Sequence, residues 1–275
     1  MLNLDEIIKF ALEEDRAFND VTTSFLVPGN AEGKAFAYAK SDGIMAGGWV
    51  AEKVFLTVDP ELKFKALKAD SEEFRKGERL FEVEGRLASI LRAERTALNF
   101  IQRMCGIATM TRKFVEEAKG TGVKIMDTRK TTPLLRSLEK YAVKAGGGEN
   151  HRFDLEEMVI IKENHIKAVC SFREAIKRAK ASKKFIEVEV TNLEELKIAL
   201  EEEVDRVMLD NFSLEDIKKA VEIAKGKVEL EASGGVTLDN VREIALTGVD
   251  MISVGSLTHS FKSADISLLV EEVYE

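Results

Sequence analysis

The sequence predicts an α/β fold, in which an N-terminal α+β sandwich domain precedes an incomplete parallel α/β barrel of six strands. Over residues 1–85 helical and strand-like patterns mix irregularly, whereas later on short apolar strands alternate with amphipathic helices. A flat doubly wound sheet would show the same spacing. Polar residues at the carboxyl ends of the strands favour the barrel, because these ends meet at one pocket there. We expect domains over 1–107 and 108–262, with a C-terminal helix over 263–275 able to pack back on the first domain.

The first domain begins with an amphipathic helix over residues 4–14, where apolar side chains recur at positions 4, 7, 8, 11 and 12. The other elements expected before residue 86 are a turn and an extended segment over 15–23, a strand over 35–39, a loop over 43–48, a helix over 49–58 anchored in the core by Trp49 and Phe55, and strands over 62–68 and 79–84.

Two helices are expected between the domains, over 87–104 and about 108–119, with Gly106 as the break between them. Gly120 and Gly122 follow the second helix at the usual place for a left-handed cap. The barrel strands are then expected over 123–127, 158–162, 185–190, 205–209, 228–232 and 250–254, and the helices over 133–144, 171–181, 193–202, 213–224 and 237–246.

Composition narrows the class of protein. The 275 residues carry a net charge of −8 and only 7% aromatic residues, which argues against general nucleic-acid binding. Two cysteines do not make a disulfide framework, and no stretch resembles a signal peptide or a membrane span. We therefore expect a soluble globular protein of the reducing cytoplasm, and we treat Cys105 and Cys170 as small buried side chains.

A basic stretch stands out in this acidic chain. Between Lys124 and Arg152 seven Lys or Arg face three carboxylates, a local balance of 7 − 3 = +4. Such an island suggests a local anionic ligand. We expect Arg129, Lys130, His151 and Arg152 to form the anion site, and regard Arg136, Lys140 and Lys144 as a solvated helix face.

Lys162 ends an otherwise apolar strand, and two interpretations of it stay open. It is either a Schiff-base nucleophile, as in barrel aldolases, or a fixed cation for a carboxylate or phosphate.

Carboxylates and glycines end the later strands. Glu189 and Asp210 are hard oxygen ligands that suit Mg²⁺ bridging to a phosphate, although they could instead neutralise Arg129 or Lys162. The loops that follow the last two strands commonly bind phosphate through backbone N–H groups in a barrel. The residues of these two loops are Ser233, Gly234, Gly235, Gly255 and Ser256, and His259 is a possible further donor.

Several motifs in one order resemble those of the quinolinate phosphoribosyltransferase family, also called nicotinate-nucleotide pyrophosphorylase (carboxylating). The resemblance covers essentially the whole chain. The motifs are Glu94-Arg-Thr-Ala-Leu-Asn99, Gly106-Ile-Ala-Thr109, Asp127-Thr-Arg-Lys-Thr-Thr-Pro133, Gly146-Gly-Gly-Glu-Asn-His-Arg152, Ile161-Lys-Glu-Asn-His165, Glu187-Val-Glu189, Leu209-Asp-Asn-Phe212 and Glu231-Ala-Ser-Gly-Gly235.

The resemblance implies a reaction of quinolinate with phosphoribosyl pyrophosphate that gives nicotinate mononucleotide, pyrophosphate and carbon dioxide. It also implies a homodimer with sites shared between chains, in which Arg95 reaches in from the partner. Quinolinate would be held by Arg95, Thr128, Arg129, His151, Arg152 and Lys162. Phosphoribosyl pyrophosphate would be held by Lys130, Lys162, Glu189, Asp210, Ser233, Gly234, Gly235, Gly255, Ser256 and His259. Lys130, Glu189 and Asp210 would be catalytic, with Mg²⁺ on the two acids.

Two alternatives to this function are considered. The first is a barrel lyase that uses Lys162 as a Schiff base. The second is a relative with the same fold that binds an anion without turnover.

Overall fold

The computed structural model describes residues 3–274 and divides into two compact units. The first unit comprises the residues up to 110, residues 132–147 and those from 261 onward, and the second comprises 111–131 and 148–260. The units are therefore not two consecutive pieces of chain. Contacts assign residues 132–147 to the first unit, whereas the sequence placed them in the barrel domain that begins at residue 108. The residues from 261 onward also belong to the first unit, on which the sequence let the segment from residue 263 pack back.

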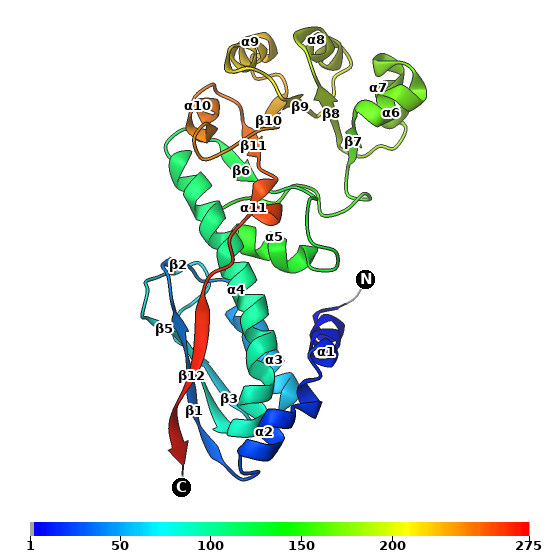
Figure 1. Cartoon of the computed structure of the whole chain (residues 1–275). Coiled ribbons are helices and arrows are strands. Elements are labelled where there is room, and N and C mark those ends of the chain that lie inside the picture. Colours follow the sequence, from blue (N-terminus) through cyan, green and yellow to red (C-terminus); the bar gives the residue numbers. More distant parts are fainter. Residues whose placement is uncertain (1–2, 275) are drawn as a thin grey trace. The chain divides into compact units, whose positions relative to one another are not determined.

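The first unit is built on a sheet with strand order β12-β1-β5-β3, in which each neighbouring pair is antiparallel (Figure 1). A second, two-stranded sheet pairs β2 with β4. The elements of this unit are α1 (Leu4–Glu14), a 3₁₀ turn (Ala17–Asn19), α2 (Val21–Leu26), β1 (Glu32–Ala39), β2 (Gly43–Ile44), α3 (Gly48–Val58), β3 (Lys63–Ala66), β4 (Glu73–Phe74), β5 (Arg79–Arg86), most of α4 (Leu87–Glu117), α5 (Arg136–Ala145) and β12 (Ile266–Tyr274).

The core of the first unit follows from the apolar pattern of its elements. Helix α1 begins at a capping box between Asn3 and Glu6 and buries Ile8 and Leu12, so the helix expected over 4–14 is confirmed. The rings of Phe55, Phe64 and Phe81 pack together with centroids 5.0–6.2 Å apart. These aromatic contacts fix α3 against the sheet.

Two local predictions in this unit are wrong. Residues 21–26 form a helix and not an extended segment, because the Asp20 side chain accepts a hydrogen bond from the backbone N–H of Thr23 and caps α2. Trp49 is 41% exposed and meets Tyr141 edge to face at 5.5 Å, so it is no core anchor.

Helix α4 runs unbroken through Gly106, where a break was expected. A Cβ atom at Gly106 would lie 2.5 Å from the carbonyl oxygen of Lys262 and 2.8 Å from the Cα of Ser263. The glycine therefore allows the backbone before β12 to approach the helix closely, and it costs too little helix propensity to stop a long helix.

The expected C-terminal helix over 263–275 is also wrong, because residues 266–274 form the strand β12. Ile266 and Leu268 are buried with the two-residue period of a strand. The backbone of β1 offers β12 a long antiparallel partner, from Ala39 with Ile266 to Glu32 with Tyr274. The sequence pattern of this short apolar and acidic stretch is compatible with a helix or a strand. Pairing with β1 determines that it forms a strand.

The second unit is an incomplete α/β barrel. Its six strands are parallel and run in the order β6-β11-β10-β9-β8-β7 (Figure 1). The strands are β6 (Lys124–Met126), β7 (Val159–Ile161), β8 (Ile186–Val190), β9 (Arg206–Asp210), β10 (Glu229–Ser233) and β11 (Met251–Ser253), and the helices are α6 (Glu163–Val169), α7 (Phe172–Lys180), α8 (Leu193–Glu201), α9 (Leu214–Ala224), α10 (Val241–Ala245) and α11 (Ser256–His259). Each of the six expected barrel strands is confirmed within two residues of its predicted bounds.

The barrel is open between β6 and β7, which do not pair with each other. Part of the free edge of β6 is covered by the unit's own chain. Glu149 forms a parallel bridge with Met126, with backbone hydrogen bonds from Glu149 to Ile125 at 2.8 Å and from Asp127 to Glu149 at 3.1 Å. This bridge places the residues that follow Glu149 beside the carboxyl end of β6. No helix within residues 3–274 is both long enough and apolar enough to cross a bilayer.

Candidate active site

A cavity of about 730 Å³ lies at the carboxyl ends of the barrel strands, entirely within the second unit. The predicted site residues that line it are Thr128, Arg129, Lys130, His151, Arg152, Lys162, Glu189, Asp210, Ser233, Gly234, Gly235, Gly255, Ser256 and His259. The remaining predicted residue, Arg95, is exposed on α4 of the first unit and does not line the cavity. Thus the chemistry predicted at six separate strand ends converges on one place, as a barrel requires.

Arg129 and Arg152 form the cationic part of the cavity. The Arg152 side chain is buried and donates to the carbonyl oxygen of Met158 at 2.9 Å. Burial lowers the pKa of Arg152, and the positive charge of Arg129 lowers it further. Within residues 3–274 neither guanidinium has a carboxylate within ion-pair distance, and the Nε atoms of both are buried without a hydrogen-bond partner. Two adjacent arginines left without an acid favour an anionic ligand.

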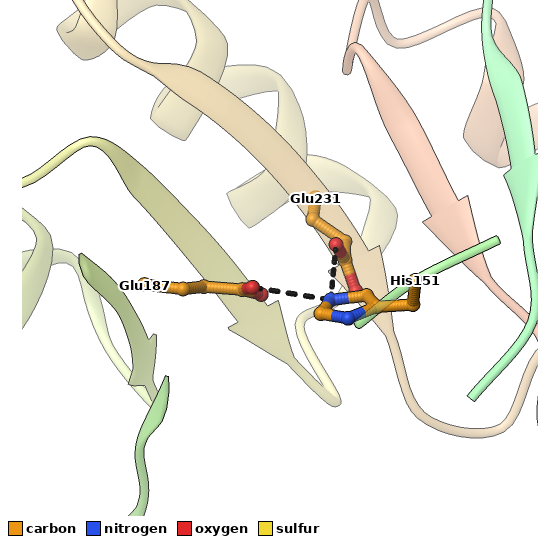
Figure 2. Close-up of side chains that lie close together, drawn as sticks. All are labelled: His151, Glu187 and Glu231. Carbon is orange, nitrogen blue, oxygen red and sulfur yellow. Dashed lines mark ion pairs between the residues drawn. The ribbon is translucent and has the colours of Figure 1, made fainter. Parts of the chain in front are cut away.

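His151 lies beside these arginines but turns inward. Its Nε2 is 3.1 Å from a carboxylate oxygen of Glu187 and 3.3 Å from one of Glu231, and both carboxylates are fully buried (Figure 2). Burial lowers the pKa of His151, but the two carboxylates outweigh it and raise the pKa to about 9. Burial raises the pKa of Glu187, and the charge of Glu231 adds to this effect.

The other ring nitrogen of His151 has a backbone partner. The N–H of Arg152 donates to Nδ1 at 2.7 Å. The two carboxylates favour an imidazole ring with two protons. The hydrogen bond from the Arg152 N–H opposes this, because it requires an Nδ1 atom without a proton. The Nδ1 contact decides the tautomer of the structure, because a protonated Nδ1 could not accept the hydrogen bond. The ring proton is therefore on Nε2.

Lys162 and Glu189 form an ion pair at the cavity, with Nζ 2.7 Å from Oε2. The alternative that these two charges neutralise each other therefore holds for Glu189. Asp210 differs, because its side chain accepts a hydrogen bond from the Asn211 amide at 2.9 Å. At the cavity wall, Asp210 thus keeps acceptor capacity that an ion pair does not use.

The Gly234-Gly235 turn follows β10 and has positive φ at both residues, +94° and +60°. A Cβ at Gly234 would lie 2.3 Å from the Oδ1 atom of Asn211, so this position needs glycine for space as well as for conformation. In the described chain the backbone N–H groups of Gly234, Gly235 and Val236 donate to no other group. Three consecutive free donors on a cavity wall are suited to phosphate oxygens.

Lys130, Gly255 and His259 lie close together at another part of the wall. A Cβ at Gly255 would be 3.0 Å from Nε2 of His259 and 3.2 Å from Cδ of Lys130. The backbone of Lys130 is held by the Thr128 hydroxyl, which accepts from its N–H at 3.0 Å, and by the Thr258 hydroxyl, which donates to its carbonyl oxygen at 2.8 Å. These contacts fix Lys130 beside the loop after β11.

Sequence reasoning missed several residues of the site. The further lining residues are Ile160, Met208, Asn211, Val236, Thr237 and Ser253. Asn211 directly follows Asp210, and its position at a strand end was the available signal. Glu187 and Glu231 carried weaker signals, because nothing in the sequence indicated that they share a histidine.

Two predictions about residues outside the cavity are wrong. Lys140 is buried on α5, so it does not belong to a solvated helix face, whereas Lys144 is exposed as expected. Cys170 is exposed, because it ends α6 in a left-handed conformation, while Cys105 is buried as expected.

An open six-stranded barrel with a cavity lined by arginines and lysines at its strand ends, in one chain with an antiparallel α+β unit, defines the class of protein to which the chain is similar. Two family models match it in order: the N-terminal domain of quinolinate phosphoribosyl transferase over residues 20–105, and the C-terminal domain over residues 107–269. The chain therefore belongs to the quinolinate phosphoribosyltransferase family, and it is an enzyme of the pentosyltransferase class.

Individual relatives agree over nearly the full length. A probable nicotinate-nucleotide pyrophosphorylase (carboxylating) of Methanocaldococcus jannaschii is 44% identical, with 96% of this chain and 95% of that protein covered. The crystal structure of NadC from Streptococcus pyogenes is 38% identical, covers 100% of this chain and 99% of its own, and has a TM-score of 0.95. A nicotinate-nucleotide pyrophosphorylase structure from Francisella tularensis is 42% identical, with coverage of 98% and 96% and a TM-score of 0.93.

Proposed function

We propose that the enzyme transfers the phosphoribosyl group of phosphoribosyl pyrophosphate to quinolinate and releases pyrophosphate and carbon dioxide. The product is nicotinate mononucleotide, a precursor in NAD biosynthesis. The observation that carries this proposal is the pair Arg129 and Arg152, which share a cavity with unpaired backbone N–H groups. The cavity thus offers one place for a dicarboxylate and another for phosphates.

Quinolinate fits the arginine side of the cavity. Its two carboxylates would replace the missing acid partners of Arg129 and Arg152, with Thr128 and Lys162 beside them. Charge-assisted hydrogen bonds of this kind contribute about 1.5–3 kcal/mol each. Binding therefore relieves the repulsion between the two arginines at the same time as it orients the ring nitrogen.

Phosphoribosyl pyrophosphate fits the glycine side. The N–H groups after Ser233 would bind phosphate oxygens, while Lys130 and His259 would lie along the pyrophosphate. The C1–oxygen bond to pyrophosphate breaks with its electron pair on the leaving oxygen, and the quinolinate nitrogen forms the new bond to C1. Lys130 stabilises the leaving group, and the acids Glu189 and Asp210 offset positive charge on the ribose.

Mg²⁺ is proposed as the cofactor. Glu189 and Asp210 line the same cavity and offer carboxylate oxygens, which fits an ion that proteins usually hold by one or two carboxylates together with substrate phosphates. When bound, the ion would neutralise charge on the departing pyrophosphate. Within residues 3–274 these acids form no closed group of three ligands, so the phosphates would have to complete the coordination.

Decarboxylation follows the transfer. The glycosylated ring is a pyridinium, which accepts the electron pair of the carbon–carboxylate bond as carbon dioxide leaves. A proton then takes the place of the lost carboxylate at that carbon. Arg129 and the buried Arg152 hold the carboxylate out of water and in a fixed orientation before it departs.

The Schiff-base alternative is less consistent with the site. A Schiff-base lysine needs a free amino group to attack the carbonyl carbon, whereas the amino group of Lys162 is engaged in an ion pair with Glu189 at 2.7 Å. Borohydride trapping of a carbonyl substrate on Lys162 would revive this alternative. An anion-binding protein without turnover is not expected for a member of this enzyme family.

We also propose a homodimer in which the partner's Arg95 completes the quinolinate site. Within the described residues Arg95 is exposed and has neither a hydrogen bond nor an ion pair. Large apolar side chains of the same unit are exposed as well, Phe18 by 58%, Val21 by 67%, Phe25 by 85% and Leu26 by 76%. Such a patch favours burial against another chain.

A mixing experiment tests the shared site. Arg95→Ala chains and Arg152→Ala chains are each expected to be nearly inactive alone. Mixed dimers would carry one intact site, so up to about a quarter of the wild-type activity should return if subunits exchange at random. Proven subunit exchange without any recovery would rule out the composite site.

Turnover is tested directly with quinolinate and phosphoribosyl pyrophosphate, with and without Mg²⁺, by following nicotinate mononucleotide and pyrophosphate. We expect one of each per quinolinate consumed and loss of turnover in EDTA. Product from nicotinate but none from quinolinate would overturn the substrate assignment. A cytoplasmic location is part of the proposal, and the free thiols of Cys105 and Cys170 are consistent with it.

A further inference from the structure

Beneath the arginine side of the cavity, three side chains from separate parts of the barrel meet at one nitrogen. Glu187 comes from β8 and Glu231 from β10, and both carboxylates point at Nε2 of His151 (Figure 2). Both glutamates are fully buried, and neither lines the cavity. They therefore have no direct access to a ligand, and the proposed mechanism gives them no task.

The geometry fixes where the ring carries its proton. Two carboxylates lie 3.1 and 3.3 Å from Nε2, within ion-pair distance but without the geometry of a regular hydrogen bond. Because both groups offer only acceptor atoms, the ring proton is favoured on Nε2. With the proton there, Nδ1 keeps its lone pair and accepts the backbone N–H of Arg152 at 2.7 Å. A proton on Nδ1 would lose both sets of contacts at once. The glutamates thus select the tautomer that can bind the Arg152 backbone.

Several contacts hold the segment of His151 and Arg152 in place, and the hydrogen bond to the imidazole ring is one of them. The buried carboxylate of Asp127 accepts from the backbone N–H of His151 at 2.8 Å, and the Arg152 guanidinium donates to the carbonyl oxygen of Met158 at 2.9 Å. The hydrogen bond to Nδ1 connects the His151 residue, which Asp127 holds, to the Arg152 residue, which contacts Met158. It sets the backbone of Arg152, and hence the point from which the guanidinium enters the cavity.

Two glutamates and a histidine this close together could also bind a metal ion in place of the Nε2 proton. Two observations argue against it. A metal would need the Nε2 lone pair, which the proton occupies in the tautomer described above. In addition, Arg206 places Nη1 at 3.8 Å from both carboxylates, and a nearby cation opposes a second one. Arg206 is held there by Glu229 at 2.9 Å.

We propose that Glu187 and Glu231 are positioning residues for quinolinate, which act by holding His151 in the Nε2–H tautomer so that its Nδ1 fixes the backbone of Arg152. This role rests on the proposed function, because it assigns Arg152 to a quinolinate carboxylate. It also explains why two buried acids lie beneath a site that binds anions. The two carboxylates face the Nε2–H group of the imidazole and the Arg206 guanidinium, and they do not line the cavity.

Paired substitutions separate tautomer selection from charge. The double variant Glu187→Met and Glu231→Met removes both acceptors, while Arg206 retains Glu229 as a partner. The double variant Glu187→Gln and Glu231→Gln removes the charges but leaves amide oxygens that can accept from Nε2–H. Glu229→Gln is the matched control, because Glu229 lies on β10 like Glu231 and pairs with Arg206, whereas the ion pairs of His151 are with Glu187 and Glu231.

The readouts are the ¹⁵N resonances of the imidazoles and the kinetics of both substrates. The chain has three histidines, so a His151→Gln sample assigns the resonance. We expect the wild type to show a protonated Nε2 and an accepting Nδ1. The Met pair should lose this signature and raise the KM for quinolinate on the order of 10- to 100-fold, with a smaller change for phosphoribosyl pyrophosphate. The Gln pair should keep the signature and lose less.

Three results would overturn the proposal: a wild-type His151 with its proton on Nδ1, an unchanged quinolinate KM in the Met pair, or a shift of the His151 resonances on adding Zn²⁺. If the Met pair does not fold by circular dichroism, the single Met variants and the wild-type tautomer still decide. A wild-type protein that shows the expected tautomer but does not turn over quinolinate would refute the proposed function and leave the tautomer assignment standing.

Discussion

Buried charges are treated differently in the two units of the chain. In the first unit, the buried carboxylate of Asp59 receives hydrogen bonds from Arg86 at 2.6 and 2.7 Å, from Ser89 at 2.7 Å and from the backbone N–H of Glu61 at 3.1 Å. In the barrel, the neighbouring guanidinium groups of Arg129 and Arg152 have no carboxylate partner among residues 3–274. Satisfied charges hold a structure together, whereas unsatisfied ones are kept for a ligand at some cost in stability.

The largest expected effect concerns the arginines without a carboxylate partner. Arg152→Met should reduce kcat/KM for quinolinate by about 10³-fold or more, because a buried charge partner of the substrate is lost. The same change should leave the free energy of unfolding unchanged or raise it by about 1 kcal/mol, since a buried charge beside Arg129 disappears. Steady-state kinetics and urea denaturation measure the two effects.

Lys144→Met is the control for this prediction, because Lys144 belongs to the same basic stretch but is exposed on α5. It should change neither quantity appreciably. A loss of stability in Arg152→Met comparable to the loss expected for a paired charge would erase the contrast between the units.

The phosphate side gives the next effect. Gly234→Ala should raise the KM for phosphoribosyl pyrophosphate by about 10- to 100-fold, because the new methyl group would collide with the Asn211 side chain and displace the free N–H groups. Gly226→Ala shares the positive φ but meets nothing within 4 Å, so it controls for backbone strain alone. Equal kinetics for the two variants would show that the turn itself does not bind the phosphate.

A stability effect without a catalytic one is expected in the first unit. Asp59→Asn should lower the free energy of unfolding by about 2–3 kcal/mol, because the hydrogen bonds from Arg86 lose their charged acceptor. Turnover per folded molecule should stay within about twofold of the wild type, since Asp59 does not line the cavity. Differential scanning calorimetry and kinetics on the same sample compare the two.

The smallest effect concerns pH. The Arg86 guanidinium, opposed by burial, lowers the pKa of Asp59 from its ordinary 3.8 to about 2. A carboxylate whose pKa is lower in the folded state stabilises the protein above pH 3.8 and loses this contribution as the pH falls toward 2. Because Arg86 is half exposed, about 1–2 kcal/mol is expected between these limits.

Denaturant midpoints between pH 5 and pH 2 measure this contribution. The curves of the wild type and Asp59→Asn should converge as the pH falls through the window. Parallel curves over the whole range would mean that Asp59 does not titrate in the folded protein with a lowered pKa.

Local patterns predicted the elements of the barrel well, because each strand is a short apolar run that ends in polar residues. Three features escaped prediction because distant partners decide them. The glycine at 106 serves a close approach of residues 262 and 263, and β12 is a strand because β1 is available to it. Helix α2 depended on a single cap at Asp20.

The sequence predicted which residues belong to the site better than it predicted the contacts among them. Residues at strand ends converge by topology, so Arg152, Lys162 and Asp210 could be placed together without a structure. The meeting of His151 with Glu187 and Glu231 could not, because three segments far apart in sequence determine it. A glutamate inside an apolar strand indicates only that something buried must compensate its charge.

The position of β12 has a consequence for synthesis of the chain. Its strand pairs with β1, and the Tyr38 hydroxyl donates to Glu271 across a separation of 233 residues. On a ribosome, β1 emerges before the barrel strands, and the edge that it offers to β12 stays bare until residues 266–274 have been made. The sheet of the first unit is therefore completed only after the barrel has been translated, and a chain that stops before residue 266 would carry an open edge prone to aggregation.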